Sequence, residues 1–475
     1  MKIDSNSFYL GFIIMHMLHK LRHNKTAREC FALTWPVSLQ AVLAASLGMI
    51  DIMMIGHLGE EAVAAMALAG RIQFVLLIVG AAFGTAASIL VAQYSGAGQQ
   101  NKLPGILAQI IVLGMIIVLP LLLATQIYSG QIIQLGSYDP RVIQLSKEYL
   151  YIILPSLVPL LLYQILEGAL RGLRQVKLPM VLGTVAMLLN ILFNWIFIYG
   201  QLGIEPMGVE GAALATMLTR LLLIGLLLAF LLVVRHECLP SKQHLSLKET
   251  PLAWRKLLVI VIPTAVNFSI WATGTFAYQL IFGMLGTSAL AAMGMIAPIE
   301  GTLISLFIGV ANAATVIIGR ELGQSDFESA YRYAWNFAKG ISFCSFCVGV
   351  GLLLLDDWLL SPYTIESSDT YESAKVLIWI SAFGLCIKNA NMMFSNGILR
   401  TGGDTQNCLI IDVTGMWLIG IPAPFLLASM GAPLYLVFVC AYLEEIVKMG
   451  LFIRRILSKL WMRNLTHEEH QTISV

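Results

Sequence analysis

Charged side chains are scarce in this sequence. Only 12% of the 475 residues are Asp, Glu, Lys or Arg, whereas 58% are hydrophobic. A soluble domain carries about 25% charged residues, so the deficit excludes an ordinary soluble protein and favours an integral membrane protein. The formal net charge is +2, which gives no reason to expect a nucleic-acid partner.

Cysteine is also sparse, and the sequence lacks the clusters that metal centres and enzymes need. Seven cysteines are scattered along the chain, and Cys344 and Cys347 form a CxxC pair. The pair lies in the apolar run GISFCSFCVGVGLLLL, without the context of a redox or zinc site, so we interpret it as packing. With no nucleophile motif or phosphate-binding loop either, we expect neither an enzyme nor a cofactor.

The N-terminal stretch does not resemble a signal peptide. It reads FYLGFIIMHMLHKLRH, is interrupted by His16, His19 and Lys20, and is followed by no small-residue cleavage site. We expect an amphipathic helix on the membrane surface.

Long apolar runs dominate the rest of the chain, and about 20 residues suffice for a helix to cross a bilayer. Twelve such runs cover residues 31–56, 65–95, 104–128, 148–171, 178–200, 209–234, 257–283, 288–319, 333–355, 373–397, 406–429 and 432–453. Of the Lys and Arg residues between, beyond and at the ends of these runs, 21 fall on one side and three on the other. The positive-inside rule then places both termini in the cytoplasm, which suits a multi-pass protein of a bacterial inner membrane.

The chain repeats itself at an offset of 227 residues. GHLGEEAVAAMALAGRI begins at Gly56, and the similar GMLGTSALAAMGMIAPI begins at Gly283. Six spans per half give both halves the same orientation, so the fold class is an all-α membrane protein. We expect twelve transmembrane helices in two six-helix bundles, related by a pseudo-twofold axis along the membrane normal. Such an architecture suits alternating access.

The repeat also sets the expected domain organisation. Residues 1–30 form an N-terminal cytoplasmic or interfacial segment, 31–234 the N-terminal bundle, 235–256 a cytoplasmic linker, 257–455 the C-terminal bundle and 456–475 a cytoplasmic tail.

One acid, Asp51, lies in the first apolar run, where a charge costs roughly 2.5–3.5 kcal/mol. The repeat aligns it with Tyr278, so the fold does not require the acid. Either Asp51 is a working group, or it lies at the helix mouth in contact with water. Asn190 and Asn194 share one face of the fifth run at i,i+4 spacing. They either hold helices together or face Asp51 in a polar pocket.

The chain resembles the multidrug and toxic compound extrusion (MATE) family over residues 31–455. The resemblance rests on MIGHLGEEAVAA after the first span, GTAASILVAQYSGAG, GALRGLRQVKLPM running into LLNILFNWIFIYG, GVEGAALAT, and NGILRTGGDTQ in the second half. It implies a monomeric antiporter that exports organic, often cationic or amphipathic small molecules against an inward flow of H⁺ or Na⁺. Two bundles then enclose a central cleft.

The same resemblance assigns the coupling residues. Asp51 matches the first-span acid that takes H⁺ or a monovalent cation. Asn190 and Asn194 match the polar positions around that acid in the DNA-damage-inducible branch, and Thr216 extends the cluster. The second amide position is often an acid in that branch, so Asp51 is the main titratable group here.

The chain departs from the norfloxacin-exporter branch in its second half. That branch has acids in the seventh and tenth spans, whereas here the seventh has none and the tenth has Asn389 after Lys388. We therefore expect coupling in the N-terminal half, and place the substrate cleft at Tyr278, Glu300, Lys388, Asn389 and Asn391.

The remaining charges have simpler interpretations. Glu300 is either a cleft residue that attracts cations or a structural group, and Lys388 pairs with Glu300 or Asp412. Asp412 itself is interpreted as a solvated helix start. We expect Glu167 to order its helix end together with Arg171, and Lys448 to pair with Glu444. Glu444 and Glu445 are interpreted as structural groups.

Two other functions stay open. A dedicated exporter of one secondary metabolite has the same sequence features as a multidrug pump. A flippase for lipid-linked precursors needs a cationic cavity, for which the spans offer few basic residues.

Overall fold

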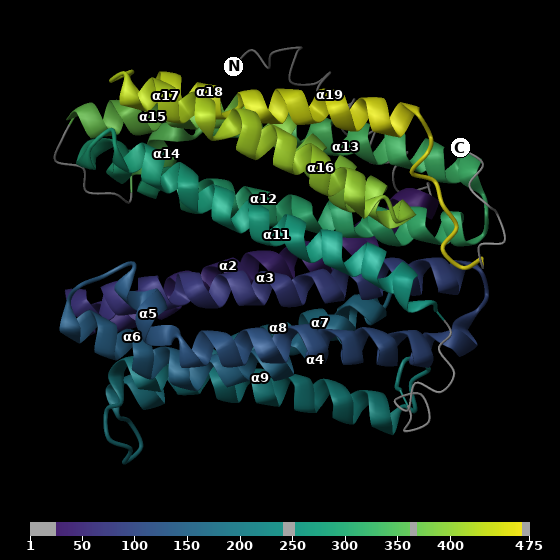
Figure 1. Cartoon of the computed structure of the whole chain (residues 1–475), viewed down its shortest axis with the longest axis horizontal. Coiled ribbons are helices and arrows are strands. Elements are labelled where there is room, and N and C mark those ends of the chain that lie inside the picture. The colour runs from purple at the N-terminus through teal and green to yellow at the C-terminus, as the bar shows by residue number, and fades with distance from the viewer. Residues whose placement is uncertain (1–24, 241–251, 362–367, 468–475) are drawn as a thin grey trace, which may run out of the picture.

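Two helical bundles make up the protein, as the computed structural model shows (Figure 1). The structure describes residues 25–240, 252–361 and 368–467, in which the regular elements are all helical. This confirms the all-α fold class. The amphipathic helix expected near the N-terminus lies outside the described residues.

The N-terminal half forms the lower bundle of Figure 1 and the C-terminal half the upper one. The lower bundle contains α2 (Lys25–Ile55), α3 (Glu60–Gly96), α4 (Leu103–Ile127), α5 (Ser129–Gln134), α6 (Pro140–Ile153), α7 (Leu157–Gly172), α8 (Lys177–Tyr199) and α9 (Gly208–Val233). The upper bundle contains α11 (Trp254–Gly283), α12 (Thr287–Gly323), α13 (Phe327–Leu354), α14 (Asp356–Leu360), α15 (Ser368–Met392), α16 (Thr405–Gly415), α17 (Pro422–Ser429), α18 (Leu434–Ala441) and α19 (Leu443–Leu457).

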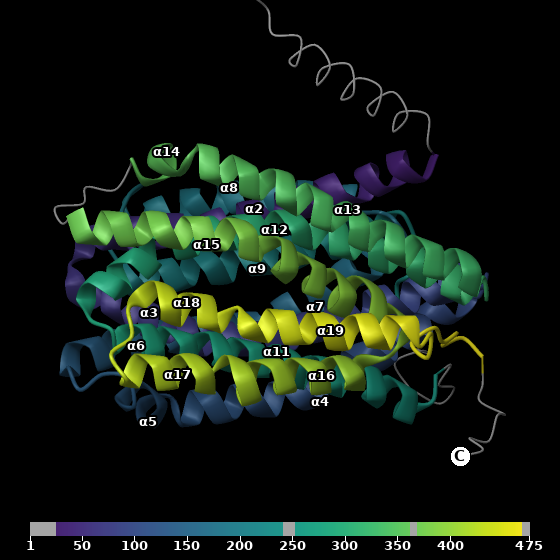
Figure 2. The same cartoon turned by 90° about the horizontal axis from the view of Figure 1, so that it is seen from above.

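Eleven of the twelve predicted spans match helical segments that are long and apolar enough to cross a membrane, in the described residues. The last predicted span, 432–453, is divided into α18 and α19 at Tyr442, and the two follow one another along one line (Figure 2). The span predicted at 148–171 begins earlier, at Pro140, and contains a short tighter turn, Leu154–Ser156, between α6 and α7. Pro155 lies in that turn and lacks the N–H that a continuous helix needs.

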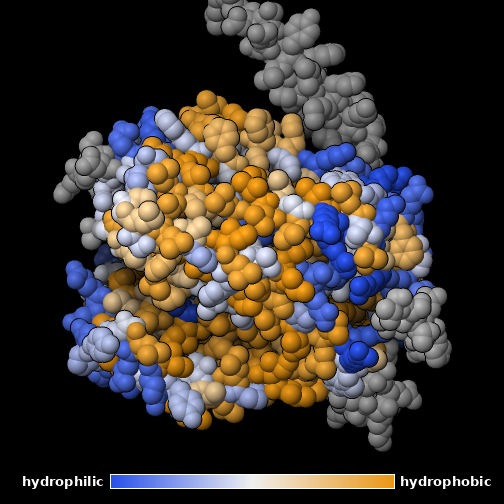
Figure 3. All heavy atoms as spheres, turned by 45° about the horizontal axis from the view of Figure 1, so that its top comes forward, coloured by the Kyte–Doolittle hydropathy of each residue, from blue (hydrophilic) through white to orange (hydrophobic). Residues whose placement is uncertain are grey.

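The surface suits a lipid environment. A broad apolar region lies between polar ends on the face shown in Figure 3. The side chains of Cys344 and Cys347 are exposed on α13, which corrects their interpretation as packing residues. Thiols on a lipid-facing surface need no protein partner because the surroundings are already apolar.

Segments from the chain's end join the two bundles on one side of the molecule. The buried Gln93 at the end of α3 donates to the carbonyl oxygens of Thr401 (2.7 Å) and Arg463 (3.3 Å). The Leu465 N–H donates back to Gln93 Oε1 (2.7 Å), and Trp461 is fully buried. We call residues 458–467 the carboxyl-terminal clasp. In Figure 1 the clasp descends from α19 to the end of α3.

Small residues let α3 and α7 pack closely. A Cβ atom on Gly168 in α7 would overlap the Gly84 carbonyl of α3, which is backbone and has no alternative rotamer. We expect Gly168→Val to lower the free energy of unfolding by about 1–3 kcal/mol, seen as a lower Tm in detergent. The matched control is Gly340→Val, since a Cβ there meets no atom within 4 Å. Equal Tm values for the two variants contradict the prediction.

Candidate functional site

A chain of polar side chains connects three helices of the N-terminal bundle. Asn194 of α8 donates to Asp51 Oδ1 of α2 at 2.6 Å, and also to Asn190 Oδ1 at 3.1 Å. Asn190 donates in turn to the Thr216 hydroxyl of α9 at 3.3 Å. The structure therefore brings together the four residues that the sequence grouped.

This network is largely shielded from solvent. The amides of Asn190 and Asn194 are buried, while Asp51 is half-buried four residues before α2 ends. Asn194 Oδ1 is buried without a partner. Buried polar groups need hydrogen-bond partners. A change in the charge of Asp51 on α2 therefore alters its bond to Asn194 on α8, and with it the packing of the two helices.

Arg220 of α9 belongs to the same region, and the sequence analysis missed it. Its guanidinium donates to the Ser156 hydroxyl at 2.7 Å and interacts electrostatically with Asp51. A lone arginine in the apolar run ATMLTRLLL was the available signal, because intramembrane charges are rare. The count of basic residues considered only the loops and the span ends, so it did not include Arg220.

A cavity of about 440 Å³ lies between the two bundles. Of the five residues predicted for a cleft, Lys388, Asn389 and Asn391 line it. Tyr278 and Glu300 are absent from its lining and contact other polar groups behind it. From the N-terminal bundle, the lining includes Glu167 and Arg171, which the sequence analysis placed together and which form an ion pair at 3.7 Å.

Glu300 and Lys388 form a polar cluster with Ser381 and Tyr442. Glu300 of α12 accepts from Lys388 at 3.3 Å, which settles the choice of partner for Lys388. Ser381 (2.5 Å) and Tyr442 (2.9 Å) also donate to this carboxylate. Both oxygens of the half-buried Glu300 therefore accept hydrogen bonds, and Tyr442, at the break between α18 and α19, is one of the donors.

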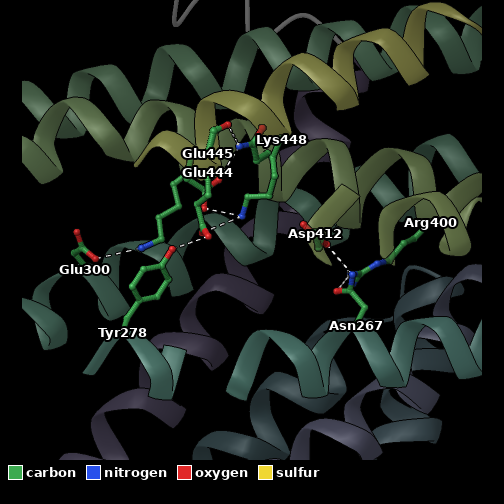
Figure 4. Close-up of polar contacts among 10 residues, drawn as sticks. Asn267, Tyr278, Glu300, Arg400, Asp412, Glu444, Glu445 and Lys448 are labelled. Carbon is green, nitrogen blue, oxygen red and sulfur yellow. Dashed lines mark hydrogen bonds and ion pairs between the residues drawn. The ribbon is translucent and has the colours of Figure 1, made fainter. Parts of the chain in front are cut away.

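Lys448 lies beside two carboxylates of its own helix. Its ammonium is 3.3 Å from Glu444, which confirms the expected pairing, and 3.0 Å from Glu445, which the sequence analysis did not pair with it. Tyr278 of α11 donates to Glu444 at 2.7 Å (Figure 4), and Asn391 donates to Glu445 at 2.7 Å. These contacts tie α19 to α11 and to the end of α15.

A separate cluster surrounds Arg400 (Figure 4). Its guanidinium donates to Asn267 Oδ1 at 2.6 Å and lies over the Phe268 ring at 4.6 Å. Asn267 donates to Asp412 at 2.8 Å. Asp412 lies eight residues inside α16 and lines the cavity, so its interpretation as a solvated helix start was wrong.

A π-helical turn, Met393–Leu399, places Arg400 in the interior. Arg400 falls between the predicted spans 373–397 and 406–429, and the sequence analysis singled out neither Arg400 nor Asn267, because neither the wider turn nor the contact across helices has a local sequence signal. Such turns often mark functional sites. Among the described residues, no group of three or more His, Cys, Asp or Glu is arranged to hold a metal ion.

Comparisons with known proteins agree with this architecture. The MatE family model matches residues 36–196 and 263–426, one match in each half. The chain is 24% identical to the multidrug resistance protein NorM of Photobacterium profundum, over 85% of this chain and 88% of that protein. It is 26% identical to the multidrug resistance protein MdtK of Edwardsiella ictaluri, over 85% and 88% of the two chains.

Solved structures share the fold. The Vibrio cholerae MATE transporter VcmN in the bent form superposes with a TM-score of 0.81 at 19% identity, covering 92% of this chain and 98% of that one. The eukaryotic MATE transporter AtDTX14 superposes with a TM-score of 0.80 at 18% identity, covering 93% and 97%. The twelve-helix, two-bundle fold is therefore common to all three chains.

Proposed function

The chain belongs to the MATE family of membrane transporters, and we propose that it exports organic small molecules by cation-coupled alternating access. Curated relatives over most of the chain are named multidrug resistance proteins. The observation that carries the proposal is the bond between Asp51 and Asn194, which links a half-buried carboxylate on α2 to a fully buried amide on α8. An ion that binds Asp51 changes this bond and hence the packing of α2.

Asp51 alternates between a protonated and a charged state during the proposed cycle. Protonation from outside removes the negative charge that Asn194 and Arg220 stabilise. The helix then repacks, bending near Pro36 or Gly48, and substrate leaves outward. Loss of the proton to the cytoplasm restores the first state. A Na⁺ ion is the alternative coupling ion, since the network that contains Asp51 also contains amide and hydroxyl oxygens, which are ligands that hard cations prefer.

We place the chain nearer the DNA-damage-inducible branch than the norfloxacin-exporter branch. Its α11 contains no Asp or Glu, and the tenth predicted span has Asn389 where the second branch has an acid. Asn389 instead donates to Ser345 at 2.9 Å. Coupling is therefore assigned to the N-terminal bundle.

The same proposal includes orientation and assembly. Both termini face the cytoplasm of a bacterial inner membrane, and the protein acts as a monomer. Residues 31–234 and 257–455 move as two units joined by the linker 235–256. The cavity between the bundles is then exposed to each side of the membrane in turn.

A lipid-linked precursor flippase is the second candidate, because four cationic side chains line the cavity. They are Arg171, Lys388, Arg400 and Lys448. Each has a carboxylate within 4 Å, so their charge is largely matched, and this weakens the case for phosphate binding. Export of one dedicated metabolite is a narrower form of the main proposal.

Transport in proteoliposomes tests the proposal. A cationic dye is loaded, and a pH gradient or a Na⁺ gradient is imposed separately at matched ionic strength. We expect dye efflux under the pH gradient, stopped by a protonophore. If the Na⁺ gradient alone drives efflux, the coupling ion is Na⁺ and not H⁺. Equal efflux with and without either gradient contradicts cation coupling.

A further inference from the structure

A second pocket, of about 550 Å³, lies at the end of the N-terminal bundle that is opposite the carboxyl-terminal clasp. Its lining residues come from the region 126–129, where α4 ends and α5 begins, from the region 147–152 of α6, and from Glu210 in the first turn of α9. We call it the rim pocket. In Figure 1, α5 and α6 lie at the left and the clasp at the right. The rim pocket shares no lining residue with the cavity between the bundles, so it is a separate site.

The rim pocket carries charges of both signs. Lys147 lines it together with the acids Glu148 and Glu210. Among the described residues, none of these three has an ion pair within 4 Å, so their charges are available to a ligand. Glu148 accepts from Gln144 at 2.9 Å, and a carboxylate accepts about four hydrogen bonds, so it retains capacity. A Cβ atom on Gly130 would lie 2.9 Å from Lys147 Cε, so the glycine leaves room for the lysine beside α5.

An unpaired amide oxygen and an apolar rim complete the pocket. Gln126 Oε1 is buried without a partner, and a buried acceptor favours a ligand that brings an N–H donor. The side chains of Ile127 and Tyr151 line the same pocket and are 70% and 72% exposed. Tyrosines at the ends of membrane helices are typical of the boundary between lipid headgroups and acyl chains. The charged lining therefore suits a headgroup, and the apolar rim suits the acyl chains attached to it.

We propose that the rim pocket binds a phospholipid whose headgroup carries both a primary ammonium and a phosphate. Lys147 binds the phosphate, the carboxylates of Glu148 and Glu210 bind the ammonium, and the acyl chains leave over Ile127 and Tyr151. A primary ammonium has three N–H donors for these acceptors, whereas a trimethylammonium has none. An anionic lipid satisfies Lys147 but is repelled by both acids. The pocket thus selects phosphatidylethanolamine over phosphatidylcholine and phosphatidylglycerol.

Native mass spectrometry of the purified full chain tests the inference. The protein is released from micelles that contain equal amounts of the three lipids with identical acyl chains, and the retained lipid is identified by its mass. We expect phosphatidylethanolamine to be retained roughly fivefold more often than either competitor, since exposed charge pairs are individually weak but several act together here. Equal retention of the three lipids overturns the inference. Displacement of the lipid by an equal concentration of soluble glycerophosphoethanolamine also overturns it, because the ligand is then a free solute.

Variants assign the preference to the rim pocket. We expect Lys147→Met to lower the retention of phosphatidylethanolamine, and Glu148→Gln and Glu210→Gln each to reduce the preference over phosphatidylglycerol, because an acid that repels the anionic lipid is lost. The matched controls are Arg141→Met and Glu61→Gln, at exposed positions outside the lining, and should keep the wild-type preference. Unchanged Tm values show that the variants are folded. A preference that survives in the triple variant of Lys147, Glu148 and Glu210, or that is lost equally in the controls, overturns the assignment.

Discussion

Replacing Asp51 by asparagine is expected to abolish gradient-driven export while leaving the fold intact. The Asn side chain has almost the same shape, and its carbonyl oxygen can still accept from Asn194, so the contact between α2 and α8 persists. It cannot bind or release a proton near neutral pH. Efflux driven by the imposed gradient should fall to that of protein-free vesicles, a loss of at least about tenfold.

The controls separate coupling from binding and folding. Asp51→Glu keeps an acid and should retain part of the activity, while Asp357→Asn removes an exposed acid and should change nothing. Dye binding without a gradient, and the Tm, should be unchanged in Asp51→Asn. Normal gradient-driven efflux by that variant would falsify the assignment of Asp51 as the coupling residue.

Replacing Lys448 by methionine should destabilise the protein severely. Lys448, Glu444 and Glu445 each expose 10% or less of their side chains, and the lysine is the cation that both carboxylates contact. Removing one member of a buried ion pair leaves an uncompensated charge, which costs about 3–5 kcal/mol. We expect a marked fall in Tm, measured by tryptophan fluorescence during heating in detergent, and a lower yield of folded protein.

A compensating variant distinguishes lost charge from lost packing. Lys448→Met combined with Glu444→Gln and Glu445→Gln removes all three charges and should recover most of the Tm. Lys339→Met removes an exposed lysine on α13 and should cost below about 1 kcal/mol. If Lys448→Met is no more harmful than Lys339→Met, the α19 ion pairs do not stabilise the fold.

The sequence was sufficient to predict the membrane helices, because length and hydropathy determine which segments can cross a bilayer. It did not predict the division of the last span at Tyr442, where a bond from its hydroxyl to Glu300 depends on tertiary packing. The π-helical turn at Met393–Leu399 was missed for the same reason. In both places the interruption allows polar side chains to meet across helices.

The candidate sites were predictable to different degrees. Asp51, Asn190 and Asn194 stand out because they are polar residues in otherwise apolar runs, and their hydrogen bonds follow that grouping. Asp412 and Arg400 lie near the ends of apolar runs, where distance along the chain suggested contact with water. The structure instead buries Arg400 and places Asp412 on the cavity lining.

The carboxyl-terminal clasp determines the geometry of any rocking motion between the bundles. Because Gln93 bonds to Thr401 and Leu465 at one end of α3, we expect the bundles to stay joined there while the far side opens, and these bonds to break before the joined side can open. With 37 residues, α3 is a lever about 55 Å long, so a rotation of about 10° moves its far end by roughly 10 Å. Because the clasp joins the bundles at this end, a small rotation between them is expected to open the opposite face widely.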